Sequence, residues 1–213
     1  KGAQHDEAWL TFMELVHKQL PTFEAKAEAL HYFPMWRTWF SLHGLCKLPW
    51  NDIIPESNKT AKEPGKVPEH VENYTWLFEG VTGNPITIEE IILASERVYN
   101  LQRLFNLRLG FGTRQWDYPP YRLMGPATEA EYESRTERYD GQLRELAGFN
   151  PEGKSTEEKM AALRQYKESQ YDLLVDAVYK RRGWSSNGIP TLETVKRLGI
   201  DFPDVVALIA KNS

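Results

Sequence analysis

Apolar residues recur along this chain at the spacing of one helical face, and no stretch alternates in the manner of a β-strand. The clearest helix begins at Thr87, where Glu90 completes a capping box, and apolar positions from Ile91 to Phe105 continue the spacing. We therefore predict an all-α fold, an irregular multi-helix domain. The expected helices cover residues 6–20, 23–32, 35–43, 68–79, 87–109, 128–146, 156–182, 192–198 and 203–210.

Proline and glycine set the boundaries of these helices. Pro21 ends the first helix. Pro34 is expected to separate the second from the third, because a proline inside a helix removes a backbone donor. Periodicity is lost after Lys47, which predicts a long surface loop over residues 51–68. Three prolines make residues 114–126 extended or rich in turns.

Composition narrows the class of protein. The chain has 213 residues, of which 41% are hydrophobic and 26% charged, as in a globular domain with a substantial core. The net charge of −4 and the lack of a basic stripe argue against nucleic-acid binding, and no apolar run is long enough for a membrane span. A single cysteine excludes an intrachain disulfide, so a reducing, cytoplasmic location is expected.

Three segments carry a family resemblance. They are SLHGLC at residues 41–46, SERVYNLQRLFNLRLGF at 95–111 and RRGWSSNGIPTLETVKRLGI at 181–200. The first is similar to an Asp-x-x-Gly-Leu-Cys motif and the second to a Gly-Glu-Arg-Ile-x-Asn-Leu-Glu-Arg helix. In this order they resemble the C-terminal region of the aldehyde ferredoxin oxidoreductase family. Each is weak alone, but together they span most of the chain.

The resemblance implies an oxidoreductase that holds tungsten, or molybdenum, in a bis-pterin cofactor and contains a [4Fe–4S] cluster. Its expected reaction interconverts an aldehyde and a carboxylate, with electrons passed to ferredoxin or a ferredoxin-like subunit. A branch of the family, the catalytic subunit of tungsten-type benzoyl-CoA reductase, would instead act on an aryl-CoA substrate. The alternative from another class is a metal-free helical interaction module, which would use the polar segment 51–68 and the charged C-terminal helices.

The same resemblance assigns the candidate site residues. Cys46 matches the fourth cluster thiolate, and Ser41, Gly44 and Leu45 belong to the motif that contacts the pterin. Position 41 is Ser where the family has Asp, so its hydroxyl offers only neutral hydrogen bonds and could instead cap the turn. Gly44 would let backbone approach a cofactor, and it is equally suited to end a helix. His43 is a weaker candidate for a proton donor.

Family members carry the other three cluster cysteines in an upstream Cys-x-x-Cys-x-x-x-Cys run, which this sequence lacks. We therefore expect residues 1–213 to form the C-terminal helical domain of a larger oxidoreductase, with its upstream domains as partners. Without the motif, a cysteine flanked by Leu45 and Leu48 would more often be a buried core residue.

Two further sets of residues have structural interpretations. Aromatic residues around the motif are expected to pack in the core rather than to line a substrate channel; they are Tyr32, Phe33, Trp36, Trp39, Phe40 and Trp50. The polar residues of the long helix are expected to form a supporting buried network; they are Glu96, Arg97, Asn100, Arg103, Asn106 and Arg108.

Overall fold

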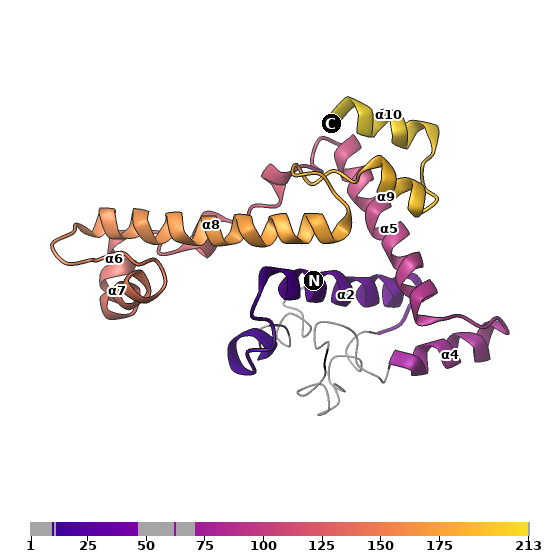
Figure 1. The fold of residues 1–213 in the computed structure, drawn as a ribbon, viewed down its shortest axis with the longest axis horizontal. Helices are drawn as coiled ribbons and strands as arrows, with labels where there is room; N and C mark the ends of the chain where they lie inside the picture. Colours follow the sequence, from indigo (N-terminus) through magenta and orange to yellow (C-terminus); the bar gives the residue numbers. More distant parts are fainter. Residues whose placement is uncertain (1–9, 11, 47–61, 63–70, 213) are drawn as a thin grey trace. The chain divides into compact units, whose positions relative to one another are not determined.

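A computed structural model describes residues 10, 12–46, 62 and 71–212, and within them the chain is all-α, as predicted. The only β-pairing among these residues is an isolated antiparallel bridge between Trp184 and Pro190. The predicted loop at 51–68 and Trp50 lie outside the described residues, apart from Lys62. The elements are η1 (Phe12–Val16), α2 (Phe23–Leu42), α4 (Glu72–Thr82), α5 (Ile88–Arg108), η4 (Arg114–Trp116), η5 (Tyr121–Met124), α6 (Glu129–Glu133), α7 (Thr136–Glu145), α8 (Thr156–Arg182), α9 (Leu192–Arg197) and α10 (Pro203–Asn212) (Figure 1).

The chain divides into two compact units. The first comprises Lys1–Arg114 with Asp176–Ser213, and the second comprises Gln115–Val175. Helix α8 therefore begins in the second unit and ends in the first.

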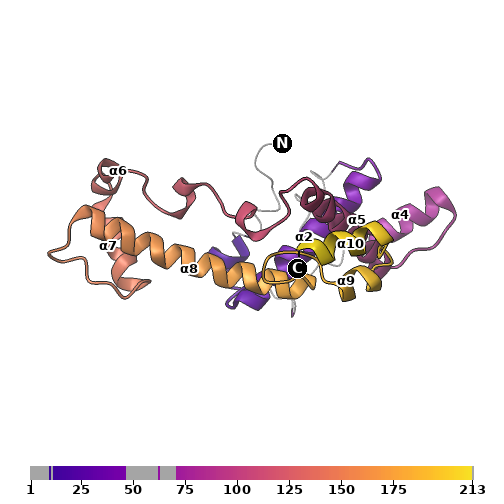
Figure 2. The same cartoon turned by 90° about the horizontal axis from the view of Figure 1, so that it is seen from above.

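The first unit has two apolar clusters. One joins α2 to α5 and α4, and its buried members are Met13, Leu20, Ala29, Phe33, Trp36, Trp39, Phe40, Val71 and Ile91. The other joins the C-terminal half of α5 to α9 and α10, which lie beside that helix (Figure 1, Figure 2). Its buried members are Leu104, Leu107, Ile189, Val195, Leu198, Ile200, Val205 and Ile209. Burial of these side chains supplies the main stabilisation of the unit.

The second unit packs α6 and α7 against the first part of α8 around Tyr132, Tyr139, Leu143 and Leu163. The prediction of one helix over 128–146 was wrong, because the chain breaks between α6 and α7. The Ser134 hydroxyl donates to the Glu131 carbonyl at 2.8 Å, and the Thr136 hydroxyl donates to the Glu133 carbonyl at 3.0 Å. Such local side-chain donors compete with the helical backbone ladder and favour a turn.

Several predicted boundaries are confirmed. Thr87 and Glu90 form both hydrogen bonds of the capping box at the start of α5. Helix α8 spans the predicted residues 156–182, and α9 begins at the predicted residue 192, after the cap of Thr191. Helix α4 extends past the predicted end at residue 79 to Thr82, where Gly83 ends it in a left-handed conformation. Residues 114–126 contain two short 3-10 helices in addition to turns.

The first predicted helix is shorter than expected. Its described part is a π-helix that stops at Val16 instead of Leu20. Lys18 adopts a positive φ of 53°, and the Gln19 N–H donates back to the Met13 carbonyl at 2.8 Å. This left-handed stop precedes Pro21, which disfavours helical backbone at the residue before it.

Helix α2 is continuous through Pro34, so the predicted break there was wrong. Pro34 has no N–H to donate to the Leu30 carbonyl, which would leave that acceptor without its helical partner. The Arg182 Nη2 donates to this carbonyl at 3.1 Å and replaces the missing donor. A helix that the local sequence would interrupt is thus completed by an arginine from the last turn of α8.

We predict that Arg182→Ala destabilises the protein by about 1–3 kcal/mol, because the Leu30 carbonyl loses its donor. Pro34→Ala restores a backbone N–H at that position, so it should recover part of this loss in the Arg182→Ala background. Urea unfolding of both single variants and the double variant checks the coupling. Arg144→Ala, which removes an exposed arginine of α7, serves as the control. Strictly additive effects of the two substitutions would contradict this role of Arg182.

Candidate functional site

Helix α2 ends in a tight turn that carries the predicted site residues. Gly44 has a φ of 68°, and the Leu45 N–H donates to the Phe40 carbonyl at 2.9 Å, which closes a Schellman turn. A Cβ at Gly44 would meet no atom of the described residues within 4 Å, so the left-handed backbone at this position is the feature that favours glycine. The predicted role of Gly44 in ending a helix is confirmed, and its contact with a cofactor stays a prediction.

Cys46 follows this turn as a free, exposed thiol. It is therefore not the inert core residue that a lone cysteine beside leucines would suggest. Ser41 and Leu45 are exposed as well, and the Ser41 hydroxyl has no hydrogen-bond partner among the described residues. The turn thus presents a thiol, a hydroxyl and an apolar side chain to its surroundings.

His43 is oriented by the helix it ends. Its Nδ1 lies 3.0 Å from the Trp39 carbonyl, and its ring centroid lies 3.8 Å from that of Trp39. Because a carbonyl only accepts, this hydrogen bond requires the proton to be on Nδ1. A neutral His43 therefore presents Nε2 as a proton acceptor, and proton donation from Nε2 would require the imidazolium form.

The aromatic residues before the turn belong to the core, as predicted for Phe33, Trp36, Trp39 and Phe40. Helix α4 packs on this side of α2. The Tyr74 ring lies 4.9 Å from the Phe40 ring, and the Phe78 ring lies 5.5 Å from the Trp39 ring. These contacts support the C-terminal half of α2, from which the candidate turn extends.

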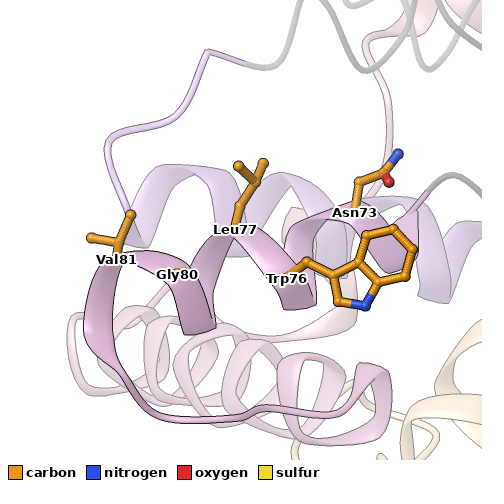
Figure 3. Close-up of a pocket in the computed structure, with 5 residues that line it drawn as sticks. All are labelled: Asn73, Trp76, Leu77, Gly80 and Val81. Carbon is orange, nitrogen blue, oxygen red and sulfur yellow. The ribbon is translucent and has the colours of Figure 1, made fainter.

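Helix α4 also bears an exposed apolar surface. Trp76, Leu77 and Val81 are 65%, 59% and 86% exposed, and with Asn73 and Gly80 they line a shallow depression (Figure 3). No side chain of α4 is buried. Solvent-exposed apolar residues gathered in this way are typical of surfaces that contact another protein segment.

The long helix α5 carries the predicted buried polar network. Glu96 is 8% exposed and accepts from Arg197 Nη1 at 2.8 Å. Asn100 Oδ1 accepts from the Trp184 indole N–H at 2.8 Å, and Arg103 Nε donates to the Gly188 carbonyl at 2.9 Å. These bonds tie α5 to the segment after α8, so the prediction of a supporting network is confirmed for Glu96, Asn100 and Arg103. It was wrong for Asn106 and Arg108, which are exposed.

The buried face of α5 differs from the predicted apolar stripe. Leu101 is 38% exposed and Phe105 is 61% exposed, whereas Ser95, Glu96 and Asn100 are buried. A hydrogen bond from Trp184 compensates the burial of Asn100, and the ion pair to Arg197 compensates that of Glu96. The Ser95 hydroxyl has no hydrogen-bond partner among the described residues. The apolar positions Ile91 and Leu104 are buried as well, so the core side of this helix combines apolar and polar residues.

His31 lies deep between α2 and α5 and is 2% exposed. Its Nε2 is 3.4 Å from a Glu96 carboxylate oxygen. Burial, together with the nearby charges of Arg181, Arg182 and Arg197, lowers the pKa of His31 to about 3. His31 is therefore neutral near pH 7. Sequence spacing could not predict this arrangement, because Glu96 and the three arginines lie far from His31 along the chain.

No group of three or more potential metal ligands occurs among the described His, Cys, Asp and Glu side chains. Glu28, three residues before His31, pairs with Arg181 instead of contributing to a metal site. No helix in the described part of the chain is long and apolar enough to cross a membrane. A metal bound at Cys46 would need further ligands from outside this described set.

Comparison with known protein families decides the classification. A family model described as aldehyde ferredoxin oxidoreductase, domains 2 and 3, matches residues 1–200. The chain belongs to this family. Aldehyde ferredoxin oxidoreductase membership implies an oxidoreductase, and the match gives no support to the benzoyl-CoA reductase branch. No curated protein and no solved structure matches the chain.

We predict that His31 makes the free energy of unfolding depend on pH. The unfolded chain protonates this residue below about pH 6.5, whereas the folded protein does so only near pH 3, so stability falls as the pH is lowered through this window. When the pH is lowered from about 7.5 to about 5, the free energy of unfolding of the native protein should fall by about 2 kcal/mol more than that of the His31→Gln variant. Urea unfolding at both pH values checks this. Equal losses in the two proteins would show that His31 does not contribute.

Proposed function

We propose that this chain supplies the C-terminal helical part of a tungsten- or molybdenum-bis-pterin, [4Fe–4S] oxidoreductase that oxidises an aldehyde to a carboxylate. Family membership supports the reaction class, and the exposed Cys46 thiol after the α2 turn is the structural observation that carries the proposal. The partners we propose are upstream domains of the same protein and ferredoxin or a ferredoxin-like subunit as electron acceptor.

The residues of the turn fit one side of such a cofactor site. Iron–sulfur clusters are held by cysteine thiolates, and Cys46 is free and exposed. Because the described residues offer no set of three ligands, Cys46 would supply one thiolate and other segments the remainder. The space beside Gly44 would allow backbone to approach a cofactor without a side chain between them.

Overall, oxidation of an aldehyde consumes one water and releases a carboxylate, two electrons and three protons. The metal-pterin group would accept the electron pair, and the cluster would pass the electrons on singly. This chain would contribute the thiolate of Cys46, and His43 Nε2 is a proton acceptor fixed on the same turn. The packing of α4 on α2 would hold both residues in place.

The alternative function is a metal-free interaction module. The exposed apolar surface of α4, made by Trp76, Leu77 and Val81, is the observation in its favour. An interaction module would need this surface and would not need the Cys46 thiol. The two functions therefore differ in their sensitivity to substitution at Cys46.

We predict that Cys46→Ala in the full-length protein removes or destabilises the cluster, because one iron loses its thiolate. Changes to groups that only support a metal ligand typically cost about 10–100-fold in affinity or activity, and loss of a ligand should cost at least as much. Iron content, the low-temperature paramagnetic signal of the reduced cluster and aldehyde oxidation rate measure the effect.

His43→Ala, three residues away on the same turn, is the matched control and should retain iron and the cluster signal. Trp76→Ala on the α4 surface should also retain both. Full iron, an unchanged signal and normal turnover in Cys46→Ala would refute the assignment of Cys46 as a cluster ligand.

A further inference from the structure

A cavity of about 630 Å³ lies in the first unit, away from the turn that carries Cys46. Its walls come from α2, α5, the last turn of α8 and α9. This volume is in the range of sites that bind small organic molecules, which span about 300–1,000 Å³. The ionisable groups in its lining are His31, Glu96, Lys180, Arg181, Arg182 and Arg197, with Glu193 at the α9 side.

Positive charge exceeds negative charge in this lining. Four cationic side chains face two carboxylates, since His31 is neutral near pH 7. Two of the cations are compensated, because Arg197 pairs with Glu96 and Arg181 pairs with Glu28. Lys180 and Arg182 have no carboxylate partner among the residues that the structure describes. With Glu193 counted as the remaining carboxylate, the lining keeps a net positive charge.

Several contacts hold the guanidinium group of Arg182 in position. Its Nη2 donates to the Leu30 carbonyl at 3.1 Å, and its guanidinium carbon lies 4.6 Å from the Tyr99 ring centroid and 5.1 Å from that of Trp184. Its Nε is buried and has no hydrogen-bond partner in the part of the chain that the structure describes. A guanidinium stacked on aromatic rings and lacking a carboxylate is typical of recognition sites for phosphate or carboxylate groups.

His31 indicates the sign of the electrostatic potential at the cavity. Its ring is 2% exposed, and its Nδ1 has no hydrogen-bond partner within the described ranges. Burial and the charges of three nearby arginines disfavour its protonation. Ile92 and Trp184 add apolar surface to the same lining. A ligand suited to this cavity combines an anionic group with an apolar part.

We propose that this cavity is a binding site for a small organic anion whose phosphate or carboxylate group interacts with Lys180 and Arg182. The anionic group would balance the positive charge of Lys180 and Arg182, which have no carboxylate partner among the described residues. The apolar part of the ligand would contact Ile92 and Trp184. This site is additional to the proposed oxidoreductase site and does not depend on it.

Calorimetric titration of the full-length protein at fixed ionic strength tests the proposal. The probes are inorganic phosphate, phenyl phosphate and benzoate, which separate the anionic group from the apolar part. Three charge variants on exposed residues accompany the native protein: Lys180→Gln and Glu193→Gln in the lining, and Lys196→Gln on α9 outside the lining.

We expect saturable binding of at least one aromatic anion, and tighter binding of phenyl phosphate than of inorganic phosphate if phosphate is the preferred group. Lys180→Gln should weaken binding about two- to fivefold, and Glu193→Gln should strengthen it by a similar factor, in line with single exposed ion pairs. Lys196→Gln should leave the affinity unchanged although it alters net charge as Lys180→Gln does.

The proposal fails if no probe shows saturable binding up to millimolar concentration. It also fails if Lys180→Gln and Lys196→Gln weaken binding equally, which would indicate a general charge effect or another site. Because the readout is binding and not turnover, either result is independent of the cluster assignment at Cys46. Circular dichroism confirms that each variant retains the helical content of the native protein.

Discussion

A proline in the middle of α2 leaves the Leu30 carbonyl without a helical donor, and the hydrogen bond from Arg182 compensates for this loss. The continuity of α2 follows from that bond. Because α2 continues to Leu42, the turn that contains Gly44 and Cys46 is attached to the same rigid helix that packs on α5. A break at Pro34 would have separated the candidate turn from this packing.

Two neighbouring arginines, Arg181 and Arg197, also connect the C-terminal segment to the long helices. Arg181 pairs with Glu28 of α2, and Arg197 pairs with Glu96 of α5, so the segment from the end of α8 to α9 is bonded to both helices. Gly188, with a φ of 76°, sits where a Cβ would approach the Tyr179 ring to within 2.7 Å. The segment therefore combines close backbone packing with ion pairs to both helices, and the excess of cations over carboxylates gives the cavity its positive character.

Local signals predicted the parts of the fold that local interactions determine. The capping box at Thr87, the cap at Thr191 and the left-handed Gly44 all act within a few residues, and each was readable from the sequence. The continuity of α2 was not, because its extra donor lies 152 residues away from Leu30. The polar residues of α5 were predicted to form a supporting network, but the exposure of Leu101 and Phe105 could not be predicted from the helical spacing of apolar residues. For the candidate site, the motif gave the residues, and the structure added the exposure of Cys46 and the tautomer of His43.

Family membership and the exposed Cys46 thiol, on a turn supported by α4, together favour the proposed metal-dependent oxidoreductase. Metal analysis of the native full-length protein, purified without oxygen, tests it most directly. The account predicts about four iron atoms and about one tungsten or molybdenum atom per chain, as a [4Fe–4S] cluster and one metal-pterin site require. A correctly folded native protein that contains neither iron nor tungsten or molybdenum would contradict the claim and favour the interaction module.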